Sequence, residues 1–584
     1  MSEKGQESPM ADPILETVFK RIKVRKQQKD AAKQIADAYK LNPVTSRILA
    51  ARGFECSDKL KNFITPTLRE GMPEPKKLKN LDAAVQLIAE HAHAGKRIAI
   101  CCDFDVDGLS GGAQVYHFLK TAGVPCEVHV PDRFEDGYGL NQKMIQKAAA
   151  NGCSLLIAID YGTTNLKELT IAHELGLKTI VIDHHHVGEH KPPTDVFINP
   201  QQRGCGFADG VLCAAGLAWY LVVALRSVLK NCADVDAKSY LDLACLGTIC
   251  DMVPLVGVNR IIAKRGLEIL EKTSRPGLIA LKNVLSLKKQ ISCTDVSFGI
   301  GPRLNAAGRL VHGDMVIELL TTTDSDTATK VARKLHELNT ERQETENDVR
   351  FKAIDLLKKR GAPQSALVVW DETFHTGVIG IVAQRLVEAY YRPAAVMGQD
   401  TEGVFKGSVR GIKGFNVVEA LGAVSEHLIK YGGHEGAGGF AVEEKKLHRF
   451  SEAFVAECAK RLKTIETEPV AEADTEVDLP DIDVSLVEEL KQLAPFGMGN
   501  PQPLVLLKDL RVVDVRDIKG AHLKATLTDG KKFITGIMWR QRTHPAVKAG
   551  WHVNIVCRPD YNNFNGVTEM QATLQAVERA SARS

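Results

Sequence analysis

Apolar and polar residues follow two different periods in the first half of the chain, from about residue 82 to residue 183. Four segments carry apolar residues at the spacing of amphipathic helices: “LDAAVQLIAEHAHAG”, “GGAQVYHFLKTAG”, “NQKMIQKAAANG” and “NLKELTIAHELG”. Between them lie short apolar segments that predict buried strands: “KRIAICC”, “CEVHVP”, “CSLLIAID” and “KTIVID”. Strands and helices in alternation predict an α/β fold with a parallel sheet and helices on both of its faces.

Residues 326–360 contain neither glycine nor proline, and the middle of this stretch, “NTERQETEND”, is polar on all sides. We expect one long helix that bridges two domains through solvent and reaches about 50 Å. After it, “SALVVW”, “GVIGIVAQRLVEAYY” and “AAVMG” predict the start of a second α/β unit.

The last part of the chain has the pattern of an all-β domain. An acidic stretch, “TIETEPVAEADTEVDLPDID”, is interpreted as a linker. From about residue 504 there follow five strand-like segments: “LVLLKDLRVVDVR”, “HLKATLTDG”, “KFITGIMWR”, “WHVNIVCRPDY” and “EMQATLQAVE”. Five short strands of this kind predict a small barrel such as an OB-fold, which often binds single-stranded nucleic acid.

Composition places the chain among globular soluble proteins. It has 584 residues, enough for about three to five domains, with 44 % hydrophobic and 25 % charged residues. The net charge of +3 indicates no nucleic-acid partner by itself. The 13 cysteines form no C-x-x-C pair, which favours free thiols in a reducing cytoplasm over disulfides or zinc. No apolar run is long enough to span a membrane.

The segment “TVFKRIKVRKQQKDAAKQ” near the start is rich in lysine and arginine. Two interpretations stay open for it. It is either the solvated basic face of a helix, which we favour, or a contact with nucleic acid.

Three aspartates, Asp103, Asp105 and Asp107, follow the predicted strand “KRIAICC” and end on a glycine. The spacing matches the opening of a calcium-binding EF-hand loop, but the twelfth position is Gln114, where that loop needs a glutamate. A strand also precedes the cluster where an EF-hand has a helix. The cluster is therefore a carboxylate site at the end of a strand, with a solvated acidic turn as the alternative.

Further acidic signals follow other apolar runs that we take as strands. They are Asp160, the run Asp183, His184, His185 and His186, and Asp251 in “LACLGTICDMVPL”. In a parallel sheet such strand ends meet at one edge. Carboxylates and imidazoles without a thiolate suit Mn²⁺ or Mg²⁺ better than zinc, and two such ions suit hydrolysis of a phosphodiester.

In this order, “DFDVDG”, “IDYG”, “DHH” and “CDMVP” resemble the four motifs of the DHH phosphoesterase superfamily. Within it, the chain resembles the RecJ family of bacterial single-strand-specific DNA exonucleases. Further segments look like signatures of that family: “PDRFEDGYGLN”, “GPRLNAAGRL”, “HTGVIGIVAQRL”, “GSVRGIKGFN”, “GGHEGAGG” and “PFGMGNPQP”.

The resemblance implies roles for particular residues. The implied metal ligands are Asp105, Asp107, Asp160, His184 and Asp251, with Asp160 bridging two ions and Asp103 as a further candidate. Asp183 and His185 are implied as ligands or as partners that orient ligands, which completes the catalytic set. The implied substrate-binding residues are Arg133, Arg303, Asn305, Arg309, Ser408, Arg410, Gly433 and His434. Tyr161 and Cys102 depart from the family pattern without removing a ligand.

The resemblance also implies a domain order. It comprises an N-terminal lead-in (1–75), a DHH catalytic domain (76–325), a bridging helix (326–362), a DHH-associated substrate-binding domain (363–466) and an OB-fold-like single-strand-binding domain (467–584).

The implied function is that of a 5′ to 3′ exonuclease on single-stranded DNA, which releases 5′-mononucleotides with two Mn²⁺ or Mg²⁺ ions in repair and recombination. Implied partners are a single-strand-binding protein and a helicase, for a cytoplasmic monomer. Two alternatives stay open. One is a DHH phosphodiesterase for short oligonucleotides or cyclic dinucleotides, and the other is a non-catalytic single-strand-binding scaffold.

Overall fold

The computed structural model describes residues 20–132, 137, 139–230, 232–287, 290–310, 312–361, 365–564 and 567–580. The chain divides into two compact units. The parallel-sheet unit comprises Ser57–Arg342 and Leu493–Gln502, and the mixed-sheet unit comprises Met1–Cys56, Gln343–Gln492 and Pro503–Ser584. Within the described residues, no helix is both long enough and apolar enough to cross a membrane.

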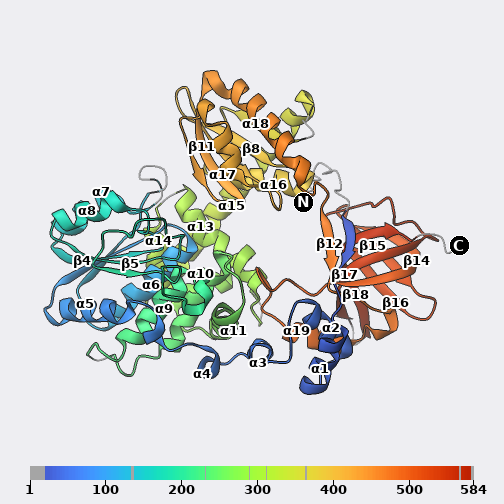
Figure 1. The fold of residues 1–584 in the computed structure, drawn as a ribbon, viewed down its shortest axis with the longest axis horizontal. Coiled ribbons are helices and arrows are strands. Elements are labelled where there is room, and N and C mark those ends of the chain that lie inside the picture. Colours follow the sequence, from blue (N-terminus) through green and yellow to red (C-terminus); the bar gives the residue numbers. More distant parts are fainter. Residues whose placement is uncertain are drawn as a thin grey trace, which may run out of the picture. The chain divides into compact units, whose positions relative to one another are not determined.

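A five-stranded parallel sheet forms the centre of the parallel-sheet unit (Figure 1). Its spatial order is β3 (Cys126–His129), β2 (Arg97–Cys102), β4 (Cys153–Ile159), β5 (Lys178–Ile182) and β6 (Val196–Ile198). The chain reverses its direction of travel across the sheet between β2 and β4. In open parallel sheets, ligands bind outside the carboxyl ends of the strands at such a point.

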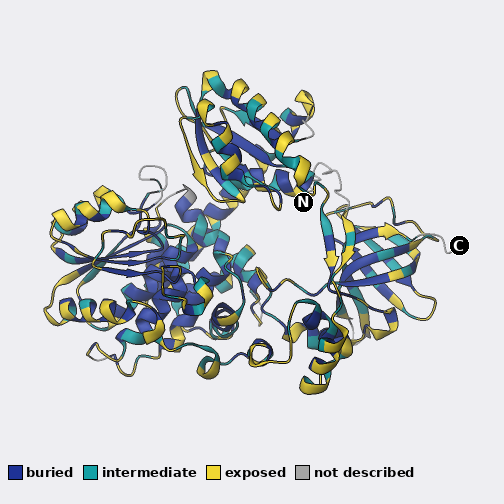
Figure 2. Ribbon diagram, viewed as in Figure 1, coloured by how far each residue is buried: buried dark blue, intermediate teal, exposed yellow. Residues whose placement is uncertain are grey.

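Helices cover both faces of this sheet, as the sequence predicts. One core joins it to α5 (Leu81–His93), α6 (Val106–Thr121) and α9 (Ala214–Leu225), and another joins it to α7 (Gln142–Ala150) and α8 (Leu166–Glu174). Figure 2 shows the central strands largely buried, with the exposed residues on the outer faces of the helices, while the edge strand β3 is half-buried. The core therefore fixes the carboxyl ends of the strands firmly.

The run before Asp251 is a helix, so the prediction of a strand there is wrong. It forms α10 (Leu241–Cys250), and Asp251 is the residue that caps its end. Nine of its ten residues are buried, so α10 lacks the polar stripe by which an amphipathic helix is recognised. A short, fully apolar run cannot be assigned to a strand or a helix from periodicity alone.

Further helices belong to the parallel-sheet unit. They are α3 (Asp58–Ile64), α4 (Leu68–Gly71), α11 (Gly257–Glu271), α12 (Pro276–Val284), the π-helical turn η4 (Asp295–Ile300), α13 (Gly301–Leu310) and α14 (Asp314–Thr321).

The long helix expected after residue 325 is present as α15 (Ser325–Arg360), one helix of 36 residues. It begins in the parallel-sheet unit and ends in the mixed-sheet unit. Its middle is not solvated on all sides as expected, because Asn339, Arg342 and Glu346 are buried. Glu346 lies 3.2 Å from the guanidinium of Arg385 in the ion pair that these two residues form.

The mixed-sheet unit contains the second α/β domain. Its sheet has the order β10 (Lys430–Gly433), β11 (Ala437–Glu443), β9 (Val404–Arg410), β8 (Ala394–Thr401) and β7 (Leu367–Asp371). Only β7 and β8 pair in parallel. The helices are α16 (Ile379–Tyr390), α17 (Val417–Ala423) and α18 (Leu447–Arg461).

Five long strands near the end of the chain close into a barrel, which confirms the predicted OB-like fold. They are β14 (Val505–Ile518), β15 (His522–Thr528), β16 (Phe533–Met538), β17 (His552–Phe564) and β18 (Val567–Arg579). β17 pairs with β18 and also with β14, which closes the barrel. The short β13 (Thr475–Glu476) pairs with β14, and α19 (Val484–Gln492) lies between them in sequence.

The basic segment near the start and the acidic stretch pair with each other, so their interpretations as a helix face and a linker are wrong in part. β1 (Arg21–Val24) pairs in parallel with β12 (Val470–Ala473), and helices α1 (Lys29–Tyr39) and α2 (Pro43–Ala51) follow. Glu466 pairs with Arg21 and with Lys23. Opposite charges on two segments far apart in sequence thus neutralise each other.

All 13 cysteines are free thiols, as the sequence predicts.

Candidate metal centre and substrate-binding residues

The turn between β2 and α6 places the first carboxylates. Asp103 follows β2 directly, and Asp105 is the N-cap of α6, where its Oδ1 accepts hydrogen bonds from the amides of Asp107 (2.9 Å) and Gly108 (3.1 Å). A Cβ at Gly108 would lie 2.6 Å from the Asp103 nitrogen, so the tight turn admits only glycine there. The motif “DFDVDG” is thus a helix start that gathers three carboxylates.

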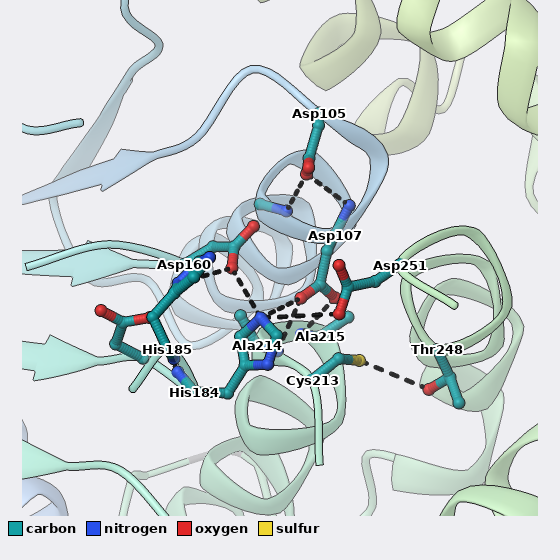
Figure 3. Close-up of polar contacts among 12 residues, drawn as sticks. Asp105, Asp107, Asp160, His184, His185, Cys213, Ala214, Ala215, Thr248 and Asp251 are labelled. Atoms are coloured by element: carbon teal, nitrogen blue, oxygen red, sulfur yellow. Dashed lines mark hydrogen bonds and ion pairs between the residues drawn. The ribbon is translucent and has the colours of Figure 1, made fainter. Parts of the chain in front are cut away.

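Asp107 is held by the start of a different helix (Figure 3). Its Oδ2 accepts a hydrogen bond of 2.7 Å from the amide of Ala214, and its Oδ1 accepts one of 2.9 Å from Ala215. Both amides belong to the first turn of α9, where the helix dipole favours a negative group. Gly247 of α10 lies against the same carboxylate, since a Cβ there would be 2.3 Å from Oδ1.

Asp160 follows β4 and is 2 % exposed. Its φ of 69° lies in the left-handed region, which a residue other than glycine rarely adopts. Its amide donates to the carbonyl of Ile182 at 2.9 Å, which ties this turn to the end of β5. Strained backbone of this kind is concentrated at functional sites, where the surrounding structure holds it.

The “DHH” segment after β5 forms a compact hydrogen-bonded loop. Asp183 accepts from the amides of His184 (2.7 Å) and Thr163 (3.0 Å) and pairs with Nδ1 of His185 (2.7 Å). Burial alone would raise the pKa of Asp183, but the hydrogen bonds from His185 and Thr163 outweigh it and hold that pKa below its usual range. Burial would likewise lower the pKa of His185, yet Asp183 raises it to about 9. Asp183 therefore orients His185.

The side chains from these four segments meet around the ring of His184 (Figure 3). Its Nε2 lies 3.2 Å from Asp160, 3.5 Å from Asp251 and 3.7 Å from Asp107. Three groups of ligand atoms lie close enough to hold an ion: Asp103, Asp105 and Asp160; Asp107, His184 and Asp251; and Asp160, His184 and His185. Asp160 is the one carboxylate shared by two groups.

The electrostatics of this cluster favour a bound cation. Burial, and then the charge of Asp107, raises the pKa of Asp105 and of Asp160, the latter strongly. The same two causes raise the pKa of Asp251 to about 8. Burial also lowers the pKa of His184, which keeps its imidazole neutral as a metal ligand requires. The carboxylates thus repel one another unless positive charge is supplied.

The donor set suits Mn²⁺ or Mg²⁺ better than zinc. Cys213 is the thiol labelled in Figure 3, and its Sγ lies 3.5 Å from Thr248 Oγ1 in a hydrogen bond. Burial, and then the charge of Asp107, raises the pKa of Cys213 well above its usual value, so no thiolate is available. The available ligands are therefore carboxylate oxygens and one or two imidazoles, which is the donor set that Mn²⁺ and Mg²⁺ prefer.

The structure places part of the predicted substrate-binding set near α13. Arg303 donates to the carbonyl of Gly299 (2.8 Å) and to Nδ1 of His336 (3.2 Å), and Asn305 is half-buried on the same helix. Arg133 and the side chain of Arg309 lie outside the described residues.

The other predicted substrate-binding residues come together on the mixed sheet. Arg410 donates to Ser408 Oγ at 2.8 Å, and both lie on β9. Arg410 pairs with Ala437 of β11, whose carbonyl accepts from the amide of His434 at 2.7 Å. Gly433 has a φ of 140°, and a Cβ there would lie 2.3 Å from the same carbonyl. “GSVRG” and “GGHEG” therefore meet at one end of this sheet.

Several residues of the site went unrecognised in the sequence. The amides of Ala214 and Ala215 carry no side-chain signal at all. The roles of Gly247 and Gly380 become visible only in the folded structure. A Cβ at Gly247 would lie 2.3 Å from Asp107 Oδ1, and a Cβ at Gly380 would lie 3.0 Å from Arg410 Nη2. The departure Tyr161 is buried in the core with α7 and α8, and Cys102 is buried against Gly112, so both affect packing behind the ligands.

The parallel-sheet fold and the carboxylate–histidine cluster together define a DHH-family protein. Three family models match the chain. They are “DHH family, N-terminal domain” (residues 97–248), “DHHA1 domain” (364–460) and “RecJ OB domain” (473–576).

Relatives match along most of their length. The chain is 30 % identical over 579 residues to the single-stranded-DNA-specific exonuclease RecJ of Escherichia coli, covering 95 % of this chain and 99 % of that protein. It is 31 % identical to the RecJ of Dickeya dadantii, covering 91 % and 95 %. A crystal structure of RecJ from Thermus thermophilus in complex with Mn²⁺ superimposes with a TM-score of 0.82 at 29 % identity, covering 96 % of this chain and 80 % of that one. A structure of RecJ with Mg²⁺ from the same organism gives 0.75 at 27 % identity, covering 96 % and 78 %. The chain belongs to the RecJ family, which confirms the resemblance and the predicted fold class.

Proposed function

We propose that this chain is a Mn²⁺- or Mg²⁺-dependent exonuclease that degrades single-stranded DNA from the 5′ end and releases 5′-mononucleotides in repair and recombination. The observation that carries this proposal is the carboxylate–histidine cluster around Asp160, in a chain whose full-length relatives are named single-stranded-DNA-specific exonucleases.

The ligand groups suggest two adjacent cation sites. Asp103, Asp105 and Asp160 would hold one ion, and Asp107, His184 and Asp251 would hold the other. Asp160 also lies 3.2 Å from Nε2 of His184, so we assign it to both sites. Bound there, two divalent ions would supply an activated water and neutralise the phosphate in an in-line displacement.

The protein's own contribution is to keep this constellation rigid before the substrate arrives. Amides of α9 fix Asp107, and the start of α6 fixes Asp105. Asp183 holds the ring of His185 by the 2.7 Å contact at Nδ1. Positioning of this kind removes the reorganisation that would otherwise slow the reaction.

Direction of digestion requires recognition of one end of the strand, and the mixed sheet supplies candidates for it. The guanidinium of Arg410 and the hydroxyl of Ser408 form a fork that suits the doubly charged 5′-phosphate. Gly380, near the start of α16, leaves room for that fork. On this proposal Ser408, Arg410, Gly433 and His434 bind the substrate end, and Arg133, Arg303, Asn305 and Arg309 contact further phosphates.

The barrel has features of a single-strand binder. A groove of about 510 Å³ crosses its strands and is lined by Arg516, Lys524 and Phe533, among others. Phe533 is 60 % exposed, and an exposed aromatic ring suits stacking with bases. The groove is of mixed charge, since Asp514 and Glu569 also line it and Asp514 pairs with Arg516. We assign the domains as the sequence suggests, at 1–75, 76–325, 326–362, 363–466 and 467–584. A single-strand-binding protein and a helicase are the proposed partners of a cytoplasmic monomer.

A nuclease assay tests the proposal directly. The wild-type chain with Mn²⁺ should release mononucleotides from a long, 5′-phosphorylated single strand, and a blunt duplex should be a poor substrate. Asp160→Ala should abolish release, because the shared carboxylate serves both ion sites, while single-strand binding persists. The matched control is Asp82→Ala, which removes an exposed carboxylate on α5.

Three outcomes would contradict the proposal. Full activity of Asp160→Ala would refute the ligand assignment. Faster hydrolysis of cyclic or short dinucleotides than of long strands would favour the small-substrate phosphodiesterase. Single-strand binding without any hydrolysis by the wild type would favour the scaffold.

A further inference from the structure

Three large apolar side chains stand out on the surface of the parallel-sheet unit. Phe298 is 74 % exposed, Met252 64 % and Met498 53 %, the highest values for large apolar residues in the described part of this unit. Isolated exposed apolar residues are ordinary, but a group at one place marks an interaction site.

These residues lie on three segments that pack together beside the candidate metal centre. Met252 directly follows the candidate ligand Asp251 and adopts a φ of 59°, at the turn that ends α10. The segment of Met498 is attached to the same turn, since the Met498 carbonyl accepts a hydrogen bond of 2.7 Å from the amide of Leu255. The segments that carry Met252 and Met498 are therefore tied together directly after Asp251.

Phe298 lies on the π-helical turn η4, which packs against the end of α10. Gly301, where η4 meets α13, packs on the residue before Asp251, since a Cβ at Gly301 would lie 2.6 Å from Cys250 Sγ. Single π-helical turns inside helices are frequent at functional sites. The exposed ring of Phe298 is thus carried by a segment that touches the end of α10.

A positive charge is bound to the turn that carries Phe298. Arg303 folds back so that its Nη1 donates to the carbonyl of Gly299, the neighbour of Phe298, at 2.8 Å. Among the described residues Arg303 forms no ion pair with a carboxylate, because its other hydrogen bond is to His336. An exposed aromatic ring and an arginine held on the same turn suit a nucleotide, with the base on the ring and a phosphate on the guanidinium.

From this arrangement we infer that Phe298 and Met252, with Met498 at the outer edge, form a stacking platform for a nucleobase of the single strand, while Arg303 holds an adjoining phosphate. The inference rests on the proposed function and adds a contact to it. Every base offers an apolar face, so the platform binds without sequence preference. A protein partner on this surface would cover the surroundings of Asp251 and hinder the substrate, so nucleic acid is the favoured occupant.

A position-by-position test uses single strands that lack one base. Matched 5′-phosphorylated oligonucleotides carry a single abasic nucleotide at each of the first several positions, and KM and kcat are measured for wild type and Phe298→Ala. One abasic position should raise the wild-type KM by about 5- to 150-fold, the range of one base–aromatic stack. Phe298→Ala should show a similar rise on the intact strand and no further rise at that position. Phe298→Trp should restore the difference.

The control variant is Leu175→Ala, which removes another exposed apolar side chain of the same unit, 45 % exposed at the end of α8. It should behave as wild type. An abasic penalty that persists unchanged in Phe298→Ala would overturn the inference. So would unchanged kinetics of Phe298→Ala together with lost binding of a single-strand-binding protein or helicase, which would identify a protein-docking surface.

Failure of the proposed function can be distinguished from failure of the platform. If the wild type releases no nucleotides, the exonuclease assignment fails. The affinity of Asp160→Ala for the same oligonucleotides, with and without Phe298→Ala, still tests the stacking contact by fluorescence anisotropy.

Discussion

Replacing Gly247 by alanine should disturb the metal centre through one methyl group. Gly247 lies inside α10, and its absent side chain leaves room for Asp107 and for the first turn of α9. A Cβ built there would be 2.3 Å from Asp107 Oδ1 and 2.5 Å from Ala215 Cβ. Both neighbours belong to the contact in which the Ala215 amide donates to Asp107, so the methyl group would push apart the carboxylate and the helix that holds it.

The size of the effect follows from two opposing contributions. Non-bonded heavy atoms settle about 3.5 Å apart, so the methyl group has to gain about 1 Å. Overpacking of this degree destabilises by about 1–3 kcal/mol, while alanine in a helix gains about 1 kcal/mol over glycine. We therefore expect a global loss of at most about 2 kcal/mol. Displacement of a ligand by about 1 Å should lower Mn²⁺ affinity about 10- to 100-fold, the range seen when a ligand loses its supporting contacts.

The assay has two readouts, calorimetric titration of the metal-free protein with Mn²⁺ and urea unfolding without metal. Gly247→Ala should lose metal affinity far more than it loses stability. Gly188→Ala is the control, because a Cβ at Gly188 meets no atom within 4 Å and the residue lies in the same unit. Wild-type Mn²⁺ affinity in a folded Gly247→Ala protein would refute the placement of Asp107 as a ligand held between α9 and α10.

Three further outcomes follow from other contacts. Gly380→Ala should reduce the preference for 5′-phosphate over 5′-hydroxyl strands several-fold without changing Mn²⁺ affinity, because the new Cβ would lie 3.0 Å from Arg410 Nη2. The measurement is the ratio of rates on matched strands, and an unchanged ratio would contradict this. The pKa of Asp251 is raised from its ordinary value of 3.8 to about 8, so this carboxyl stabilises the metal-free fold below pH 3.8 and loses that contribution as pH rises toward 8. The rise in Tm on adding Mn²⁺ should therefore be larger at high than at low pH, and an equal rise at about pH 6 and pH 8.5 would count against it. Arg260 is 1 % exposed and donates to three main-chain carbonyls. Arg260→Ala should therefore lower the free energy of unfolding, measured by urea denaturation, by about 3 kcal/mol. A loss below about 1 kcal/mol would show that those carbonyls find other donors.

Much of the parallel-sheet unit could be predicted because its signals are local. Buried parallel strands are continuous β-branched runs, and their amphipathic helices lie between them with clear periods. Asp160 and the “DHH” segment directly follow such runs, so their meeting at one edge follows from topology alone. Asp251 also lies at this edge, but the run before it is the buried helix α10. Because almost all residues of α10 are buried, its sequence lacks the alternation of apolar and polar residues that identifies a helix.

Charge pairing between distant segments could not be predicted from local patterns. Local polarity predicts a helix face for the basic residues near the start and a linker for the acidic stretch, since each is strongly polar by itself. The two pair as strands β1 and β12, and Arg25 and Arg52 both form ion pairs with Asp474. Only the fold brings these complementary charges together.

The contacts that hold the carboxylates explain why these groups can bind cations. Asp105 is held by amides at the start of α6, and Asp107 by amides at the start of α9. Among the described residues, no lysine or arginine forms an ion pair with Asp105, Asp107 or Asp251. A fixed guanidinium would neutralise the cluster permanently and compete with a divalent ion, whereas amide dipoles orient a carboxylate and leave its charge largely uncompensated. Burial, and then the charges of Asp107 and Asp105, raise the pKa of Asp251, and a divalent cation bound there would favour its ionised form against both causes. The repulsion in the metal-free site is thus linked to its affinity for metal.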